Sequence, residues 1–429
     1  MRAIELFAGC GGLALGLRSA GWKGVFAVER DPMAFETLSA NMIEGASPFR
    51  SFEEWPTWLP KTNLDIVALL NNSVTREHLK GFRGSIDLVA GGPPCQGFSV
   101  GGRRDGEDER NLLVYKMIEF VELVRPRAVL IENVEGIARR FVSKPGEAKT
   151  SVADEAIQRL QSLGYVAAHQ IINSSEFGVP QARKRVAIVA LLTDEYSQRE
   201  LTDALKIELA HAAVAVKKKH GLPADRPVTV REAIDDLADN VRIPCPDSAG
   251  YDAGIYGPAQ SSYAKLMRAG LPKAAVPNSH RFTKHGPSVQ ALYELAHRTQ
   301  PNGRLSKEFL LSAGTKKDKK VLLDPEAVVQ TITTHPDEYI HYAYPRNITV
   351  REMARLQSFP DRFTFHGRYT INGPRRKFDV ARCSQVGNAV PPLMGEGLGI
   401  AVAKLIQRFA LPNRAKREID ATEMSGARL

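Results

Sequence analysis

Short apolar runs of strand length alternate with helical patterns along the first 192 residues of the chain. Six runs are typical of buried strands, at residues 3–8, 25–28, 86–90, 128–131, 166–172 and 185–192. Between them, apolar residues at helical spacing predict helices at residues 13–20, 31–42, 112–124 and 152–163. This alternation is typical of a doubly wound α/β domain with a mostly parallel sheet.

The pattern changes after Leu192. Residues 193–345 mix helical pieces, Pro/Gly turns and clusters of lysine. Two Thr-x-x-Glu capping boxes, at residues 229–232 and 349–352, predict the starts of two short helices. Pro391 and Pro392 precede an apolar helix that is predicted to end near Phe409, and the polar stretch 412–429 is expected to fray.

The chain carries a surplus of positive charge. Its 429 residues include 58 Lys and Arg against 48 Asp and Glu, a net charge of +10, which suggests an anionic partner such as nucleic acid. The four cysteines show no CxxC spacing, which argues against a zinc site or a disulfide framework. There is no signal-peptide pattern and no apolar run of about 18 residues, so we expect a cytoplasmic protein.

A cysteine lies in a Gly/Pro-rich loop after the third predicted strand. The loop is Gly91-Gly92-Pro93-Pro94-Cys95-Gln96-Gly97-Phe98-Ser99. Two glycines let the chain bend sharply, and two prolines stiffen it before the cysteine. A thiol on a rigid loop at the mouth of a sheet is well placed to react, and the plain alternative is a buried structural cysteine.

A second glycine-rich turn, Gly9-Cys10-Gly11-Gly12, follows the first predicted strand. Glycines at this place let NAD, FAD or another nucleoside-containing cofactor approach the backbone closely. The third glycine of the dinucleotide fingerprint is missing from its usual position, which counts against NAD. Glu29, at the end of the second strand, suits a ribose diol because one carboxylate can accept from two hydroxyl groups.

Six segments resemble the motifs of cytosine-C5 DNA methyltransferases, in that family's order. They are Glu5-Leu6-Phe7-Ala8-Gly9-Cys10-Gly11-Gly12, Gly92–Ser99, Glu132-Asn133-Val134, Gln181-Ala182-Arg183-Lys184-Arg185, Arg351–Pro360 and Gln385–Pro392. The resemblance runs from residue 3 to residue 392 and leaves only residues 193–345 outside the motifs. It implies a Rossmann-like methyltransferase domain (1–192, rejoined by 379–429) with a smaller inserted target-recognition domain (193–378).

The resemblance assigns four residues to catalysis at a target cytosine. C5 of cytosine is too weak a nucleophile to take a methyl group from a sulfonium donor, but a thiolate added at C6 makes an enamine whose C5 can attack. Cys95 would supply that thiolate, and Glu132 would meet the charge that develops at N3. Arg183 and Arg185 resemble the arginines that hold the cytosine O2 and orient the active-site loop. The base that removes the C5 proton is not assigned.

The resemblance also implies S-adenosylmethionine as the cofactor. The family places an Asp near the adenine, whereas the corresponding stretch here is Leu70-Asn71-Asn72-Ser73. Asn72 could make similar hydrogen bonds, and Asp65 is nearby in sequence. The other residues placed around the cofactor are Phe7, Gly9, Gly11, Glu29, Pro93, Asn388 and Val390.

Duplex DNA is the implied substrate, and the target base must leave the helix because Cys95 cannot reach it inside a duplex. Residues 100–111 are glycine-rich and charged, which suits a lid over the substrate, and residues 193–345 are expected to read the sequence. The residues predicted to contact DNA are Gln96, Ser99, Arg103, Arg104, Arg110, Arg281 and Lys284. His280 and His285 lack a Cys or carboxylate partner at ligand spacing, so no metal site is predicted.

Three alternatives remain open from the sequence. A tRNA cytosine-C5 methyltransferase would share the fold, a catalytically inactive homologue would only bind DNA, and a nicotinamide-dependent dehydrogenase would share the glycine-rich turn. The long basic insertion favours DNA, and the presence of Cys95, Glu132 and Arg183 argues against an inactive homologue. The compact layout suggests a DNA-associated monomer from a bacterial restriction–modification system, with a cognate restriction endonuclease encoded separately.

Overall fold

The computed structural model describes residues 1–44, 47–94, 112–139, 150–237, 241–315, 319–369 and 379–409. The chain divides into two compact units, each discontinuous in sequence. The first, here called the sheet unit, comprises Met1–Asn173, Lys184–Ala215 and Met394–Leu429. The second, here called the inserted unit, comprises Ser174–Arg183 and Val216–Leu393.

These boundaries differ from the predicted ones after residues 192 and 378. The sheet unit continues to Ala215 and so includes most of α7 (Gln198–Lys219). One contact that joins α7 to the sheet is from β5, where the Gln170 side chain donates to the Thr202 carbonyl at 3.4 Å. The sheet unit resumes at Met394, inside α14 (Pro392–Phe409). Residues 174–183 belong to the inserted unit, where β6 (Gln181–Ala182) pairs with β12 (Val329–Gln330).

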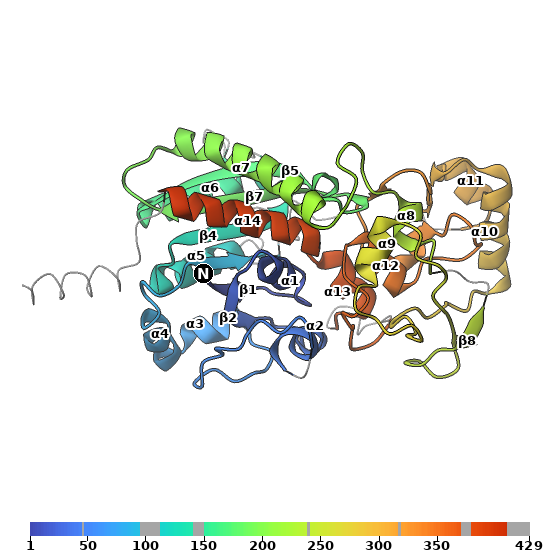
Figure 1. Cartoon of the computed structure of the whole chain (residues 1–429), viewed down its shortest axis with the longest axis horizontal. Coiled ribbons are helices and arrows are strands. Elements are labelled where there is room, and N and C mark those ends of the chain that lie inside the picture. The colour runs from blue at the N-terminus through green and yellow to red at the C-terminus, as the bar shows by residue number, and fades with distance from the viewer. Residues whose placement is uncertain are drawn as a thin grey trace, which may run out of the picture. The chain divides into compact units, whose positions relative to one another are not determined.

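Six strands form the central sheet of the sheet unit, in the order β2-β1-β3-β4-β7-β5 (Figure 1). Strand β7 is antiparallel to both of its neighbours, and the other pairs are parallel. All six strands predicted from the apolar runs are confirmed, with ends shifted by at most three residues. Their bounds are β1 (Arg2–Leu6), β2 (Lys23–Val28), β3 (Leu88–Gly91), β4 (Ala128–Val134), β5 (Tyr165–Asn173) and β7 (Lys184–Leu192).

The strand order places helices on both faces of this sheet. A right-handed crossover puts α1 (Gly12–Ser19), which leads from β1 to β2, on one face, and the connections that run back to β3, β4 and β5 lie on the other. The helices of that second face contact one another in succession. They are α3 (Ile66–Asn71), α4 (Ser73–Lys80), α5 (Leu112–Val124) and α6 (Val152–Ser162). The fold is therefore a doubly wound, Rossmann-like α/β fold, as predicted.

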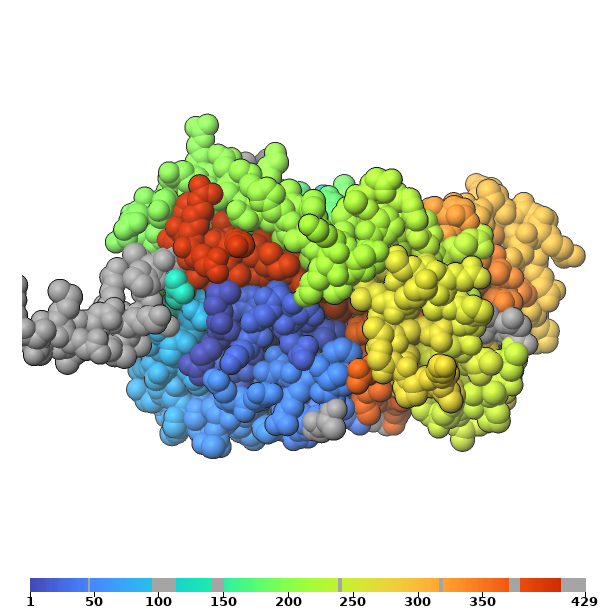
Figure 2. Space-filling view, viewed as in Figure 1, coloured from blue at the N-terminus to red at the C-terminus, as the bar shows by residue number. Residues whose placement is uncertain are grey.

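The last helix of the sheet unit packs on the first. A Cβ atom on Gly399 of α14 would lie 2.8 Å from Ala20 Cβ, so a glycine is required for this close approach. The Trp22 indole donates to the Gly399 carbonyl at 3.0 Å. Figure 2 shows α14 (red) at the surface between blue N-terminal segments and the green segment of α7.

One stretch of the described chain, Arg382–Phe409, is long and apolar enough to cross a membrane by length and composition. Its most apolar window is 78% buried inside the structure, which is the pattern of a core helix.

The inserted unit is built from shorter pieces. Within its described residues the strands span two or three residues, and apart from α10 and the end of α7 no helix exceeds seven. The strands besides β6 and β12 are β8 (Arg242–Pro244), β9 (Asp252–Gly254), β10 (Gly303–Arg304), β11 (Val321–Leu322) and β13 (Tyr339–Ile340). The helices are α8 (Val230–Ile234), α9 (Ser262–Met267), α10 (Pro287–Thr299), α11 (Lys307–Ser312), α12 (Val350–Leu356) and α13 (Arg382–Asn388). Both predicted capping boxes are confirmed, at the starts of α8 and α12.

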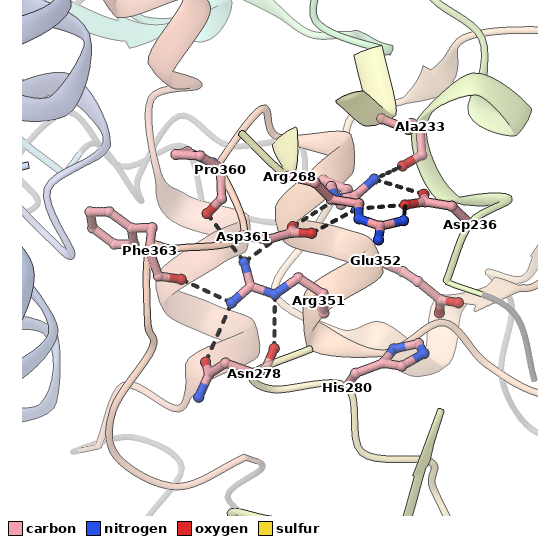
Figure 3. Close-up of polar contacts among 12 residues, drawn as sticks. Ala233, Asp236, Arg268, Asn278, His280, Arg351, Glu352, Pro360, Asp361 and Phe363 are labelled. Atoms are coloured by element: carbon pink, nitrogen blue, oxygen red, sulfur yellow. Dashed lines mark hydrogen bonds and ion pairs between the residues drawn. The ribbon is translucent and has the colours of Figure 1, made fainter. Parts of the chain in front are cut away.

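A cluster of buried charged side chains lies inside the inserted unit, beside its apolar residues (Figure 3). Arg355 of α12 is fully buried and pairs with Asp236 (2.9 Å) and Asp361 (2.6 Å). Arg351, one turn earlier, donates to the carbonyls of Asn278 and Phe363 at 2.8 and 2.9 Å. These contacts tie α12 to segments that are far apart in sequence.

Candidate functional site

The glycine-rich turn after β1 has a backbone that few residues adopt. Phe7, Gly9 and Gly11 have φ angles of 55°, 57° and 97°, and at Phe7 this left-handed conformation is unusual for a side chain of its size. The Glu29 carboxylate, at the end of β2, accepts from Gly9 N at 2.8 Å and from Asp31 N at 2.7 Å. Burial raises the pKa of Glu29. Glu29 therefore fixes the turn and has remaining acceptor capacity for a ligand's hydroxyl groups.

The turn lies at the point where the strand order reverses. From β1 the chain passes to β2 on one side and later returns to β3 on the other, and the ends of the two inner strands pair at Leu6 and Gly91. A Cβ atom on Gly91 would lie 2.5 Å from the Leu6 carbonyl oxygen, so glycine is needed there. Open α/β sheets bind ligands at such a switch point, outside the carboxyl ends of the strands.

A buried carboxylate that sequence reasoning passed over lies beside this turn. Glu5 of β1 is 3% exposed, accepts from the Ala14 backbone amide at the start of α1, and has no hydrogen-bond partner for Oε2 among the described residues. Burial, with the nearby charge of Glu29, raises the pKa of Glu5 to about 8. An unpaired buried oxygen of this kind is a place for a ligand's donor group.

The structure distinguishes Asn72 from Asp65. Leu64 N donates to the Glu29 carbonyl at 2.7 Å, which brings Asp65 to the carboxyl end of β2, where it caps α3. Asn72 lies at the other end of α3, is exposed, and accepts from Thr75 N at 3.0 Å as the N-cap of α4. Of these two residues, Asp65 is therefore the one at the carboxyl end of β2. A sequence signal was available, since an Asp directly before the apolar run 66–70 predicts a helix cap.

A carboxylate and a guanidinium meet where β4 ends. Glu132 is 7% exposed, and its Oε1 lies 3.1 Å from Nε of Arg185 on the neighbouring antiparallel strand β7. Burial lowers the pKa of Arg185, although the charge of Glu132 opposes this. A Cβ atom on Gly92 would lie 3.2 Å from Glu132 Oε2, so the loop after β3 passes directly over this carboxylate.

Asn133 anchors that loop. Its side-chain amide donates to the Pro93 carbonyl at 2.9 Å, and its oxygen accepts from Val134 N at 2.8 Å. Pro93 is buried and Pro94 is exposed. The residues that follow lie outside the described part of the chain, including Cys95, Gln96, Ser99, Arg103, Arg104 and Arg110.

The second predicted arginine belongs to the inserted unit. Arg183 is 4% exposed and donates through Nη1 to the carbonyls of Gly387 (2.9 Å) and Ile332 (3.2 Å). Asn388 and Val390, predicted to close the cofactor pocket, follow Gly387 directly. Arg183 and Arg185 therefore make their described contacts in different units, although the sequence suggested one shared site.

The two residues predicted to contact DNA in the inserted unit lie against aromatic rings. The Arg281 guanidinium lies 4.2 Å from the Tyr251 ring centre and 4.1 Å from that of Tyr369, and it donates to Ser248 Oγ at 3.1 Å. Lys284 is exposed, with Nζ 5.4 Å from the Tyr251 ring centre. His280 is buried, and its Nδ1 hydrogen-bonds to Thr349 Oγ1 at 2.8 Å, which indicates a structural role.

Comparisons with known proteins cover almost the whole chain. The model of the family described as C-5 cytosine-specific DNA methylase matches residues 1–404. The type II methyltransferase M.DdeI of Desulfomicrobium norvegicum is 27% identical over 99% of this chain and 95% of its own. M.AgeI of Thalassovita gelatinovora is 28% identical over 93% and 98%.

Among solved structures, an Escherichia coli prophage protein named as a DNA modification methyltransferase has a TM-score of 0.62. It is 25% identical and covers 95% of this chain and 100% of its own. The S. pombe Dnmt2 methyltransferase has a TM-score of 0.52 at 16% identity, over 95% and 98% of the two chains, and this is a likeness of fold.

Proposed function

We propose, on the premise that this chain belongs to the C-5 cytosine-specific DNA methylase family, that it methylates a cytosine flipped out of duplex DNA through a covalent intermediate on Cys95. The family model covers residues 1–404 of 429, so the chain is a DNA cytosine-C5 methyltransferase. One observation supports the finer proposal: Glu132 and Arg185 pair beside Gly92, three residues before Cys95.

The reaction needs a nucleophile, a group that protonates or shares a proton with the ring, and a group that binds and orients the base. The Cys95 thiolate adds to C6 of cytosine, and the C5–C6 electron pair becomes available for attack on a methyl group. The Glu132 carboxyl holds or shares a proton at N3 while charge develops there, and Arg185 beside it holds the base. Loss of the C5 proton then restores the double bond, and the C6–S bond breaks to release the thiolate.

S-adenosylmethionine, when bound, supplies the methyl group, and the residues of the sheet unit suit its donors. Glu29 would accept from the two ribose hydroxyls, and Glu5 Oε2, which has no hydrogen-bond partner among the described residues, would accept from the ammonium group of the methionine part. Asp65 would accept from the adenine amino group, which is the role that the sequence predicts for Asn72. Phe7, Gly9, Gly11 and Pro93 are the other cofactor residues proposed in the sheet unit, and Asn388 and Val390 are those proposed in the inserted unit.

The inserted unit reads the DNA sequence, with Arg281 and Lys284 among its contacts, while Gln96, Ser99, Arg103, Arg104 and Arg110 contact DNA near the target base. The Arg281 guanidinium lies 4.2 and 4.1 Å from the centres of two tyrosine rings, which restrains it and lowers the entropy lost on binding. The relatives' names place them in type II systems. We propose that this chain likewise protects DNA from a separately encoded restriction endonuclease, and that it acts in the cytoplasm as a monomer.

A trapping experiment tests the proposal. Duplex DNA of randomised sequence carrying 5-fluorocytosine is mixed with the protein and S-adenosylmethionine, because fluorine at C5 blocks the last elimination. We expect an adduct in intact mass spectrometry that forms with wild type and with Cys245→Ala, and that is absent with Cys95→Ala. An adduct on RNA but not on DNA would favour the tRNA enzyme, and no adduct on either would favour an inactive DNA-binding homologue.

A further inference from the structure

Arg183 lies in a buried polar network of the inserted unit that the reaction scheme does not use. We infer that Arg183 is a positioning residue, which sets the backbone of residues 386–393 through Gly387 and so determines the affinity for the cofactor. The inference rests on the proposed function, because Asn388 and Val390 are assigned to the cofactor there. The inference gives different roles to Arg183 and Arg185, which lie in the same sequence motif.

The described hydrogen bonds of the Arg183 guanidinium are to main-chain oxygens. Nη1 donates to Gly387 O at 2.9 Å and to Ile332 O at 3.2 Å, and the side chain is 4% exposed. A charged donor makes a stronger hydrogen bond than a neutral one, and its loss would leave two buried carbonyls without this donor. The guanidinium therefore joins the end of α13 to the segment after β12.

Two glutamines complete the network around this arginine. The Gln181 amide donates to Gln357 Oε1 at 2.8 Å, and its oxygen accepts from Ile332 N at 2.7 Å. The Gln357 amide donates to the Val386 carbonyl at 2.8 Å. Each contact satisfies a buried polar group, and the two glutamines join β6, the segment after β12, the end of α12 and the end of α13.

Packing leaves the end of α13 little freedom. A Cβ atom on Gly387 would lie 2.4 Å from the Thr333 carbonyl oxygen, so the two backbones are in direct contact. On the far side, Leu393 N donates to Ser358 Oγ at 3.1 Å, and Ser358 itself has a φ angle of 63°. The segment that contains Asn388 and Val390 is thus held at both ends.

This arrangement predicts which ligand each arginine affects. Arg183 bonds to the residue before Asn388, so a change in its side chain shifts the cofactor residues of the inserted unit. Arg185 pairs with Glu132 in the sheet unit, so its loss affects the target base instead. Cofactor affinity and adduct formation can be measured separately, which makes the two roles distinguishable.

The experiment uses isothermal titration calorimetry of the DNA-free protein with S-adenosylmethionine and with S-adenosylhomocysteine. We expect Arg183→Met to weaken both by tenfold or more, Arg183→Lys to recover part of the loss, and Gln357→Leu to weaken both as well. Arg185→Met is the matched control, and it should bind the cofactor within about twofold of wild type while failing to form the 5-fluorocytosine adduct.

Duplex DNA affinity, measured by fluorescence anisotropy, completes the test and should stay within about twofold of wild type in Arg183→Met. Normal cofactor binding with loss of the adduct would place Arg183 on the base, and equal loss of cofactor and DNA binding would mean a general structural role. Either result overturns the inference. If Arg183→Met does not fold, Arg183→Lys and Gln357→Leu decide between the same outcomes. A wild type that binds no cofactor would instead overturn the proposed function.

Discussion

The cores of the two units differ in the amount of buried charge, although both also contain apolar side chains. In the sheet unit, residues 128–131 of β4 and 186–191 of β7 are fully buried and apolar. In the inserted unit, Arg351, Arg355 and Glu352 are fully buried in one short helix. In a sheet of long strands, the backbone N–H and C=O groups pair with those of the neighbouring strands. The side chains that cover the sheet can therefore all be apolar. Strands of two or three residues leave many backbone groups to be satisfied by charged side chains.

The two kinds of core differ in how strictly they determine which side chains can occupy them. Apolar burial is non-directional, and many sequences of similar volume support the same sheet. A buried guanidinium tolerates few changes in the residues around it, because each of its N–H groups needs an oxygen acceptor at hydrogen-bond distance. Burial of such groups is expensive, and removing one partner leaves an uncompensated charge. We therefore expect the inserted unit to respond more sharply than the sheet unit to single changes.

The largest effect is expected from Arg355→Met. It would remove the shared and shortest ion-pair partner of Asp236 and Asp361, leaving them the longer pairs with Arg268 (3.4 Å) and Arg351 (3.7 Å). It should destabilise the inserted unit by about 4 kcal/mol, as for other broken buried pairs. Hydrogen exchange read by mass spectrometry can localise the loss to peptides of the inserted unit. Arg231→Met is the control, because its pair with Glu326 is exposed and should contribute less than about 1 kcal/mol. Equal effects of the two variants would contradict the comparison.

Leu130→Ala should destabilise the sheet unit by about 3 kcal/mol, from lost burial and the cavity that remains. All three tryptophans, Trp22, Trp55 and Trp58, belong to the sheet unit, so their fluorescence during urea unfolding reports on this unit. Ile171→Ala on β5 is the matched control, since Ile171 is 52% exposed and should change stability little. A large effect of Ile171→Ala would show that this face is covered in solution.

Acid should weaken the inserted unit before the sheet unit. Burial lowers the pKa of His280 to about 4 and that of His341 to about 3, so the folded state binds fewer protons than the unfolded state from pH 6.5 down to these values. Stability therefore falls as pH falls through this window, by about 2 kcal/mol between pH 7 and pH 5.5 for the two together.

This pH effect can be followed by hydrogen exchange at several pH values. The pKa of Glu352 lies well below its ordinary value, because Arg346 and His341 outweigh the effect of burial, so its own contribution is lost only at lower pH. Exchange in peptides 278–285 and 339–352 that does not change between pH 7 and pH 5.5 would contradict the assignment of the two histidines.

The smallest effects are expected at the two capping boxes. Thr229→Ala should cost about 1 kcal/mol, the usual value for a lost N-cap. Thr349→Ala should cost more, up to about 2 kcal/mol, because Thr349 is buried and also bonds to the His280 ring. Thermal unfolding of the two variants measures the difference, and identical values would mean that burial adds nothing to the cap.

The same contrast explains what the sequence could predict. Apolar runs revealed all six strands of the sheet, because buried parallel strands are continuous apolar segments. The two- and three-residue strands of the inserted unit are too short to show a period. Arg351 and Arg355 are four residues apart, a spacing that a solvent-exposed helix face would share, so their complete burial was not visible. The sequence did not predict α7 as one long helix either, because its many alanines and lysines do not form a clear apolar face opposite a polar one.

In the candidate site, the residues at strand ends were predictable and the contacts between loops were not. Glu29 directly follows β2 and Glu132 lies near the end of β4, so both are at the carboxyl edge of the sheet. The Asn133 bond to Pro93 and the position of Asp65 depend on how distant segments meet. The alternation of an extended strand would put Arg183 and Arg185 on one side, but β6 ends before Arg183 and β7 begins after it.

The packing of α14 on α1 has a consequence for synthesis of the chain. The sheet strands are complete at Leu192, but the helix that covers α1 begins about 200 residues later. At ribosomal rates of roughly 5–20 residues per second, the nascent sheet waits on the order of 10–40 s with the apolar side of α1 uncovered. The inserted unit leaves the ribosome during that interval. A chaperone that shields exposed α1 would therefore act on this chain while it is still attached to the ribosome.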